Sequence, residues 1–224
     1  MTRLLVLTAA DVEARGLARH LGLAVAGGAP GRFAGGGIEI AAVGVGARHL
    51  ASRVTPPSSS TIVVSAGACG ALSPDLPVGA LVAPEAVLAS SGERHPTAAV
   101  TGLARLGTLL STDRVIEDAA AKSRLWLETG ALAVDMESAA ILAWAVAHGV
   151  PGIVVRGVSD AAARGVPADL ARVVHDDGRV RPLRAVSAVL ARPGALVDAM
   201  ALRAAAAAAL KTVAAALAKL QRAQ

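Results

Sequence analysis

The sequence contains almost no aromatic side chains. Phe33, Trp126 and Trp144 are the whole set, and tyrosine is absent. Proteins that bind single-stranded nucleic acids without sequence preference stack the bases on aromatic side chains. A nucleic acid partner is therefore not expected, although the formal net charge is +5.

Cysteine and metal-ligand patterns are equally scarce. Cys69 is the only cysteine, which excludes an intramolecular disulfide and suits a reducing compartment. Because the sequence shows no accompanying histidine and asparagine pattern, we interpret Cys69 as a small buried thiol and not as a nucleophile. The five histidines lack ligand spacing, and the glycines at 44 and 46 lack the third glycine of a dinucleotide fingerprint. We expect neither a metal nor another cofactor.

Long apolar runs are also missing. No uninterrupted run reaches the roughly 18 residues of a membrane span, because Lys211 and Lys219 break the alanine-rich segment after Arg203. The short run at residues 4–10 leads directly into Asp11, which favours a buried first strand over a signal peptide. We expect a cytoplasmic protein, at most peripheral to the inner membrane.

The excess of positive over negative charge lies entirely in the C-terminal part of the chain. Residues 1–160 carry 12 Lys/Arg against 13 Asp/Glu, whereas residues 161–224 carry 10 against 4. Two interpretations stay open for this basic segment. It is either a solvated helix face or a surface attracted to anionic lipid or to a partner.

Short apolar runs alternate with helical patterns, which predicts a single α/β domain over residues 1–224 with a mixed, largely parallel sheet flanked by helices. Strands are expected at residues 3–9, 38–43, 61–66, 81–88, 107–110, 131–134 and 152–158. Helices are expected at residues 11–21, from Gly46 through Val54, and at 117–127, 137–148, 182–190 and 195–220. The C-terminal segment from about residue 182 is thus predicted to be basic and helical.

Polar residues follow several of these strands. In an open parallel sheet, ligands bind beyond the carboxyl ends of the strands. This rule selects residues 10–13, 44–46, 67–70, 135–137 and 156–160. We expect these five segments to meet at one pocket.

Four motifs at these positions carry a family resemblance. They are TAADVE at 8–13, GACGAL at 67–72, VDMESAA at 134–140 and VRGVSD at 155–160. In this order they resemble the nucleoside phosphorylase and nucleosidase superfamily, which includes methylthioadenosine/adenosylhomocysteine nucleosidase, purine and uridine phosphorylases, and futalosine hydrolase. The resemblance spans most of the chain and implies a small-molecule nucleoside substrate and a homodimer or larger assembly.

The resemblance also implies roles for individual residues. Glu137 matches the carboxylate that accepts hydrogen bonds from the ribose 2′ and 3′ hydroxyls, and Met136 matches the side chain against the sugar. Asp160, positioned by Ser159, matches the acid that protonates the departing purine. Free aspartic acid is too acidic to hold a proton near neutrality, so we expect burial to favour its neutral form.

Water is the nucleophile that the resemblance favours. Glu13, with Arg156 beside it, matches the base that orients water in the nucleosidases. Ser65 and Ala68 stand where hexameric phosphorylases carry an arginine and a phosphate-binding serine. A phosphorylase remains the alternative, with Arg48 or a partner subunit supplying phosphate contacts.

Specificity residues depart from those of the related nucleosidases. Val115 and Ile116 match the wall around the base, where Val115 replaces a phenylalanine. Ala10 replaces a methionine near the 5′ group, and Val45 lines the same region, so a roomy apolar 5′ pocket is expected. The remaining predicted substrate contacts are Ala68, Cys69 and Gly70.

Segments outside the catalytic motifs resemble one branch of the superfamily. Residues 84–96 and 166–203, with DDGR at 176–179 and RPLR at 181–184, resemble the hopanoid-associated phosphorylase-like proteins. That branch implies removal of adenine from adenosylhopane, by a purine nucleoside N-ribosyl hydrolase acting on a lipid-linked substrate. Alternatives are a methylthioadenosine/adenosylhomocysteine or futalosine nucleosidase and, without catalysis, a nucleoside- or lipid-binding module.

The acids also have ordinary structural explanations. Asp135 and Glu137 lie at a strand-to-helix junction, where acidic side chains commonly cap the helix and complement its dipole. Asp160 after Ser159 could cap a helix in the same way. We assign Asp135 a supporting role and Glu137 and Asp160 to the site.

Overall fold

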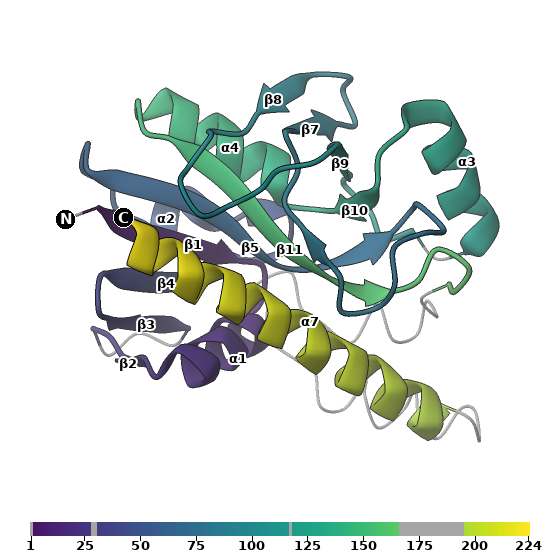
Figure 1. The fold of residues 1–224 in the computed structure, drawn as a ribbon, viewed down its shortest axis with the longest axis horizontal. Coiled ribbons are helices and arrows are strands. Elements are labelled where there is room, and N and C mark those ends of the chain that lie inside the picture. Colours follow the sequence, from purple (N-terminus) through teal and green to yellow (C-terminus); the bar gives the residue numbers. More distant parts are fainter. Residues whose placement is uncertain (1, 28–30, 117, 166–194) are drawn as a thin grey trace.

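The structure, a computed structural model, describes residues 2–27, 31–116, 118–165 and 195–224 (Figure 1). Its strands are β1 (Arg3–Thr8), β2 (Ala24–Val25), β3 (Arg32–Gly35), β4 (Ile38–Ala42), β5 (Thr61–Ala71), β6 (Leu81–Val82), β7 (Ala86–Ala89), β8 (Arg94–Pro96), β9 (Thr108–Ser111), β10 (Ala133–Asp135) and β11 (Gly152–Asp160). Its helices are α1 (Asp11–Leu21), the 3₁₀ turn η1 (Val45–Ala47), α2 (Leu50–Arg53), α3 (Ala119–Thr129), α4 (Ser138–Ala147) and α7 (Ala195–Ala223).

All strands belong to one 11-stranded sheet. The order is β2-β3-β4-β1-β5-β10-β9-β7-β8, and β11 branches from β5 and also pairs with β6. The central strands β4, β1, β5 and β11 are parallel, as are β10, β9 and β7, whereas β10 joins β5 in antiparallel register. The sheet is therefore mixed and largely parallel, which confirms the predicted fold class.

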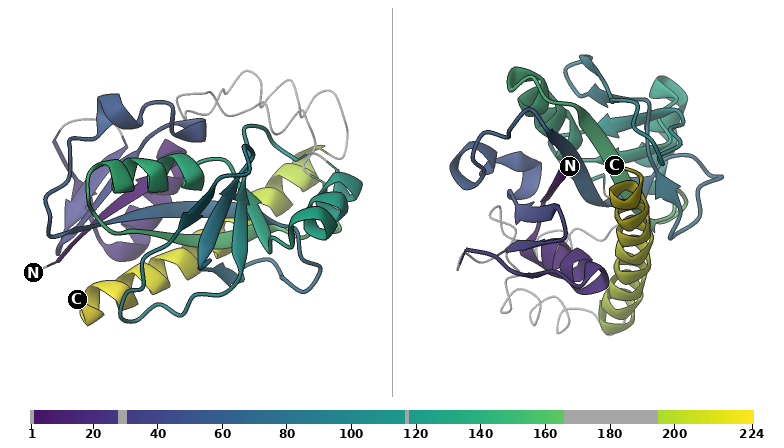
Figure 2. Two further views of the ribbon diagram at one scale, coloured as in Figure 1. Left: turned by 90° about the horizontal axis from the view of Figure 1, so that it is seen from above. Right: turned by 60° about the vertical axis from the view of Figure 1, so that its left-hand side comes forward.

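Helices cover both faces of the central strands (Figure 2). Leu4 and Val6 of β1 pack in one core with α1 and α7, whereas Leu5 and Leu7 pack in another with α2 and α4. This alternation follows from the strand geometry, in which successive side chains point to opposite faces. A strand buried on both sides has no polar face, and this is why the central strands form continuous apolar runs in the sequence.

The C-terminal helix α7 lies along β11 and α1. Its buried side chains are Ala209, Leu210, Val213, Ala214, Leu217 and Leu220. By length and composition alone the segment Met200–Ala223 could also cross a membrane. The helix predicted at residues 195–220 is thus present, and the one predicted at 182–190 lies outside the described residues.

Strand β5 is longer than predicted. It was expected to end near Ala66, but it continues to Ala71 because β11 pairs along it and β10 pairs with Gly70 and Ala71. The motif at residues 67–70 therefore lies inside a strand and not in a loop beyond it. The prediction placed this motif wrongly, because the strand is extended by pairing with β10 and β11, which the local sequence does not indicate.

Other boundaries also differ from the prediction. The strand expected at 81–88 is two strands, β6 and β7, interrupted around Pro84, which cannot donate a backbone hydrogen bond. The helix expected from Gly46 through Val54 is reduced to η1 and the single turn α2. Gly46 and Ala47 adopt positive φ values of 64° and 56°, which break the helix. The short strands β2, β3 and β8 were not predicted.

The contact between β11 and α7 depends on a glycine, which gives a testable prediction. A Cβ at Gly157 would lie 2.4 Å from the carbonyl oxygen of Ala209 in the α7 backbone. Gly157→Ala is therefore expected to lower the free energy of unfolding by about 1–3 kcal/mol, the usual cost of overpacking. Urea denaturation would measure this change.

Gly16→Ala, on α1, is the matched control at a second contact with α7. Its Cβ would meet only the flexible end of Leu210, at 2.8 Å, and alanine is about 1 kcal/mol more favourable than glycine within a helix. Stability should be retained or slightly raised. Similar losses in both variants would contradict this account of the α7 contact.

Candidate active site

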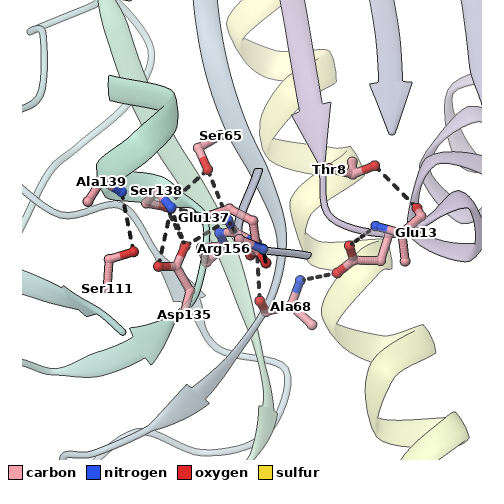
Figure 3. Close-up of polar contacts among 12 residues, drawn as sticks. Thr8, Glu13, Ser65, Ala68, Ser111, Asp135, Glu137, Ser138, Ala139 and Arg156 are labelled. Carbon is pink, nitrogen blue, oxygen red and sulfur yellow. Dashed lines mark hydrogen bonds and ion pairs between the residues drawn. The ribbon is translucent and has the colours of Figure 1, made fainter. Parts of the chain in front are cut away.

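The predicted acids lie at or near the carboxyl ends of strands, and Figure 3 shows Glu13 and Glu137 on either side of Arg156. Glu13 lies in the first turn of α1 after β1, Glu137 directly precedes α4 after β10, and Asp160 ends β11. Arg156 lies within β11 between the Glu137 and Glu13 sides of the cluster. The segments selected from the sequence thus lie together, including the turn η1, which contacts Glu137 through Gly46.

Glu13 is held by two backbone amides. Its Oε2 accepts a hydrogen bond from Ala10 N at 3.2 Å, and its Oε1 accepts one from Ala68 N at 2.9 Å. A Cβ at Gly67 would lie 2.6 Å from Glu13 Oε1 and 2.9 Å from Arg156 Nη1. The glycine therefore provides the space in which the two side chains approach each other. Among the described residues, no ion pair within 4 Å joins Glu13 to Arg156.

Arg156 is a fully enclosed charge of the site, with a side chain that is 1% exposed. Its Nη2 lies 2.7 Å from Asp135 Oδ2 and 3.3 Å from Glu137 Oε2, and it donates to Ser65 Oγ at 2.9 Å. Burial lowers the pKa of Arg156, but the nearby carboxylates raise it by more. The guanidinium is therefore permanently charged, and it forms ion pairs with two buried acids.

Asp135 and Glu137 have different partners. Asp135 accepts hydrogen bonds from the backbone amide of Ser138, at 3.2 Å to Oδ2, and from its hydroxyl. Glu137 makes no capping contact with α4; its Oε1 instead accepts a hydrogen bond from Gly46 N at 3.1 Å. Asp135 thus makes the cap-like contact at the start of α4, and the cap explanation does not apply to Glu137.

Asp160 is buried, 9% exposed, and both of its carboxylate oxygens have partners. Ser159 Oγ lies 2.8 Å from Oδ1, and the ammonium of Lys122 forms an ion pair with Oδ2. Burial was expected to favour a neutral acid, but the structure instead gives Asp160 a buried cation as its neighbour. Asp160 caps no helix among the described residues.

Lys122 was missed by the sequence analysis. It lies in α3 and is 1% exposed, yet a lysine within a helix carries no local sign of burial. Its only unusual property in the sequence is that it is the sole lysine of residues 1–160.

The remaining predicted contacts differ in how deeply they are buried. Ala10 and Cys69 are buried, whereas Ala68, Gly70, Met136, Ser159, Ile116 and Val45 are half-buried. Val115 is 39% exposed. Burial raises the pKa of the Cys69 thiol above its usual range, so this group is unreactive and not a nucleophile.

A cavity lies away from this cluster of acids. The cavity, of about 510 Å³, lies near the amino ends of β1 and β4, and it is lined by none of the predicted site residues. Within the described part of the chain, no three His, Cys, Asp or Glu side chains are placed to hold a metal ion.

Comparisons with known proteins agree with the sequence motifs. A family model described as the phosphorylase superfamily matches residues 103–192. No curated protein sequence matches the chain.

Solved structures match over almost the whole length. The 5′-methylthioadenosine/S-adenosylhomocysteine nucleosidase of Helicobacter pylori has a TM-score of 0.68 at 17% identity, covering 98% of this chain and 97% of that one. Futalosine hydrolase of the same organism has a TM-score of 0.67 at 16% identity, with the same coverage. The nucleosidase of Neisseria meningitidis has a TM-score of 0.65 at 16% identity, with 98% of each chain covered. The chain therefore has the fold of these nucleosidases, and the family-model match over residues 103–192 agrees with the resemblance seen in the motifs.

The burial of Glu137 predicts a pH-dependent stability. Burial raises the pKa of Glu137 to about 7, against the opposing effect of Arg156. A carboxyl with a higher pKa in the folded state contributes stability at low pH that is lost as the pH rises through about 7. Between about pH 5 and pH 8, the free energy of unfolding of the unmodified protein should therefore fall more than that of Glu137→Gln, by about 3 kcal/mol.

Glu128→Gln, which changes an exposed carboxylate on α3, is the control for this measurement. Its pH dependence should match that of the unmodified protein in urea denaturation. If Glu137→Gln also matched it, the carboxyl of Glu137 would not be buried as described.

Proposed function

We propose, on the premise that the chain is a member of the nucleoside phosphorylase and nucleosidase superfamily, that it is a purine nucleoside N-ribosyl hydrolase releasing adenine from a 5′-substituted adenosine. The observation that carries this proposal is the convergence of Glu13, Glu137 and Asp160 at one end of the sheet. Each carboxylate is held by hydrogen-bond donors from other elements. Such pre-positioned acids suit the cleavage of a glycosidic bond, which builds positive charge on the sugar.

Glu137 is proposed to bind the ribose. Gly46 N and Arg156 Nη2 each contact one of its oxygens, and this fixes the carboxylate in place. A carboxylate has about four lone-pair sites, so capacity remains for two ribose hydroxyls. Met136, the preceding residue, is proposed to pack against the sugar.

Water is the proposed nucleophile, oriented by Glu13. Arg156, the nearest cation on β11, is already paired with Asp135 and Glu137, and Ser65 donates or accepts within the same network. A phosphate dianion placed there would meet two buried carboxylates, and like charges repel strongly where the dielectric constant is low. This arrangement supports hydrolysis over phosphorolysis.

Asp160 is proposed to protonate the departing base. Val115 and Ile116 are proposed to form the wall around that base. The 5′ side is proposed to accept a large apolar group, since Ala10 and Val45 are small side chains. A lipid-linked adenosine such as adenosylhopane fits that expectation. The matching structures are a methylthioadenosine/adenosylhomocysteine nucleosidase and a futalosine hydrolase, and their substrates are the alternatives.

Adenine release from a series of adenosines tests the proposal. The series comprises adenosine, methylthioadenosine and a 5′-alkyl adenosine with a long chain, each assayed with and without phosphate. We expect release without phosphate, a free ribosyl product, and the highest kcat/KM for the long apolar group. A strict need for phosphate would establish a phosphorylase, and binding without release would establish a binding module.

Asp160→Asn is the diagnostic variant in this assay. Loss of general acid catalysis should lower kcat by about 10²- to 10⁴-fold with the fold retained. An Asp-to-Asn variant of the H. pylori nucleosidase was solved with 5′-methylthioadenosine in its active site. Near-normal turnover by Asp160→Asn would remove this residue from the mechanism.

A homodimer is proposed for the assembly. Val12 on α1, next to Glu13, is 55% exposed, and Val115 at the proposed base wall is also exposed. A second copy of the chain would cover apolar side chains of this kind, which favours a closed symmetric dimer. Light scattering on the preparation used for the assays would give the mass, and a strictly monomeric protein would contradict this proposal.

We propose that the protein is cytoplasmic and that its basic C-terminal segment contacts an anionic membrane surface. Its described cations, Arg203, Lys211, Lys219 and Arg222, are all exposed on α7. Each cation near an anionic surface contributes about 1 kcal/mol. We therefore expect binding to vesicles that contain phosphatidylglycerol, and at least tenfold weaker binding after all four are replaced by glutamine. Equal binding to purely zwitterionic vesicles would contradict an electrostatic contact.

A further inference from the structure

Lys122 is a fully buried lysine that the steps described above do not use. It lies one turn into α3, and its side chain is 1% exposed. Lysine is almost never fully buried unless it is paired. Its partner is Asp160, the residue proposed to serve the leaving base.

The three acceptors around the ammonium all come from the end of β11 and the turn that follows. Nζ pairs with Asp160 Oδ2, and it donates to the carbonyl oxygens of Ala161 at 3.1 Å and Arg164 at 2.9 Å. An ammonium has three N–H donors and no acceptor, so every N–H has a partner. Lys122 therefore holds the end of β11 against α3.

The same contacts determine where the proton of the pair is. Asp160 Oδ2 accepts from the ammonium of Lys122, whereas Oδ1 lies 2.8 Å from Ser159 Oγ, which is also 3.2 Å from the carbonyl oxygen of Cys69. Since Nζ has three acceptors and a neutral amine has only two N–H groups, the nitrogen is an ammonium. In this arrangement the transferable proton is on Nζ and not on the carboxyl group. An acid that must protonate a departing base then needs a source for that proton.

We propose that Lys122 is a positioning residue that holds Asp160 as a carboxylate and supplies, through Asp160, the proton that the departing base takes up. This inference rests on the proposed function and extends it. In the step, the glycosidic C–N bond breaks and its electron pair goes to the base. Asp160 Oδ2 takes a proton from Nζ and Asp160 passes a proton to a nitrogen of the base, so that Asp160 ends as a carboxylate again and Lys122 becomes a neutral amine.

The remaining atoms balance with water. The ribosyl carbon bonds to the oxygen of water, and the proton that this water loses goes to Glu13 and then to solvent. Lys122 regains a proton from solvent after the base leaves, which returns the site to its starting state. No oxidant, reductant or cofactor takes part.

The charged and titratable groups around the pair come from several elements. Cys69 of β5 lies within the electrostatic influence of Lys122, Asp160, Arg156 and Asp135. Asp118 caps the N-terminus of α3, one turn before Lys122, through the amide of Ala121. Burial raises the pKa of the Cys69 thiol, so Cys69 is neutral and adds no further charge beside the pair.

Two variants separate proton supply from simple positioning. Lys122→Arg keeps the positive charge but holds its proton too tightly to transfer it. We expect kcat to fall about 10²-fold or more at all pH values with KM within about threefold, because only the chemical step is affected. Lys122→Met removes the charge, so Asp160 must carry the proton itself, and activity should move to acid pH.

A purely structural lysine would give the opposite pattern. Lys122→Arg would then retain most of the kcat of the unmodified protein, and Lys122→Met would lower activity equally at all pH values. Either result overturns the inference while leaving the proposed function in place. Should Lys122→Met not fold, as judged by its denaturation midpoint, the arginine variant alone decides. A wild-type protein that releases adenine from no nucleoside would overturn both.

A second measurement does not depend on turnover. The chain has three lysines, Lys122, Lys211 and Lys219, so ¹⁵Nζ-labelled protein gives few signals, and Lys122→Arg assigns the relevant one. We expect the Lys122 ammonium protons to exchange slowly with water, because all three are hydrogen-bonded, and the signal to shift when adenine binds. A fast-exchanging signal that saturating adenine does not move would overturn the inference.

Discussion

One guanidinium shared by two carboxylates inside the sheet organises the site. Arg156, Asp135 and Glu137 are each nearly inaccessible to water, and both carboxylates pair with Nη2 of Arg156, whereas its buried Nε has no hydrogen-bond partner. Removing one member of such a group leaves an uncompensated buried charge, which typically costs about 3–5 kcal/mol. Since Arg156 belongs to β11, Asp135 to β10 and Glu137 to the start of α4, the ion pairs fix three elements relative to one another. These ion pairs therefore also fix the position of Glu137, the proposed ribose contact.

Two glycines on β5 provide the space that the charged side chains need. A Cβ at Gly67 would overlap Glu13 and Arg156, and a Cβ at Gly70 would lie 2.9 Å from Asp160 Oδ2. The strand that crosses the middle of the sheet thus has no side chain at the two points where acids from β11 and α1 approach it. The glycines of this motif serve side-chain packing, which differs from the backbone amide cradle that a glycine-rich phosphate loop forms.

Patterns within single elements were enough to predict much of the fold. The bounds of α1 were predicted as they occur, and β1, β4 and α4 agree within one or two residues, because caps and apolar spacing are local signals. The end of β5 was not predictable in this way, since pairing with β10 and β11 extends it. Lys122 was missed for the same reason, because its partner is 38 residues away along the chain. The motifs at strand ends indicated the acids, but only the fold reveals what neutralises each of them.

The charge balance of the site bears on the nucleophile. Apart from the exposed Arg48 beside Gly46, the charged side chains that gather there are the carboxylates of Glu13, Asp135, Glu137 and Asp160 and the cations Arg156 and Lys122. With all of them ionised, the carboxylates exceed the cations by two, and a net negative charge remains even when Glu137, with a pKa of about 7, is protonated. Such an excess stabilises a sugar that becomes cationic as its bond to the base breaks. The same excess opposes a phosphate dianion, whereas a neutral water molecule enters without that repulsion. A phosphorylase would need at least one further cation beside the sugar, whereas Ser65, which accepts a hydrogen bond from Arg156, is uncharged.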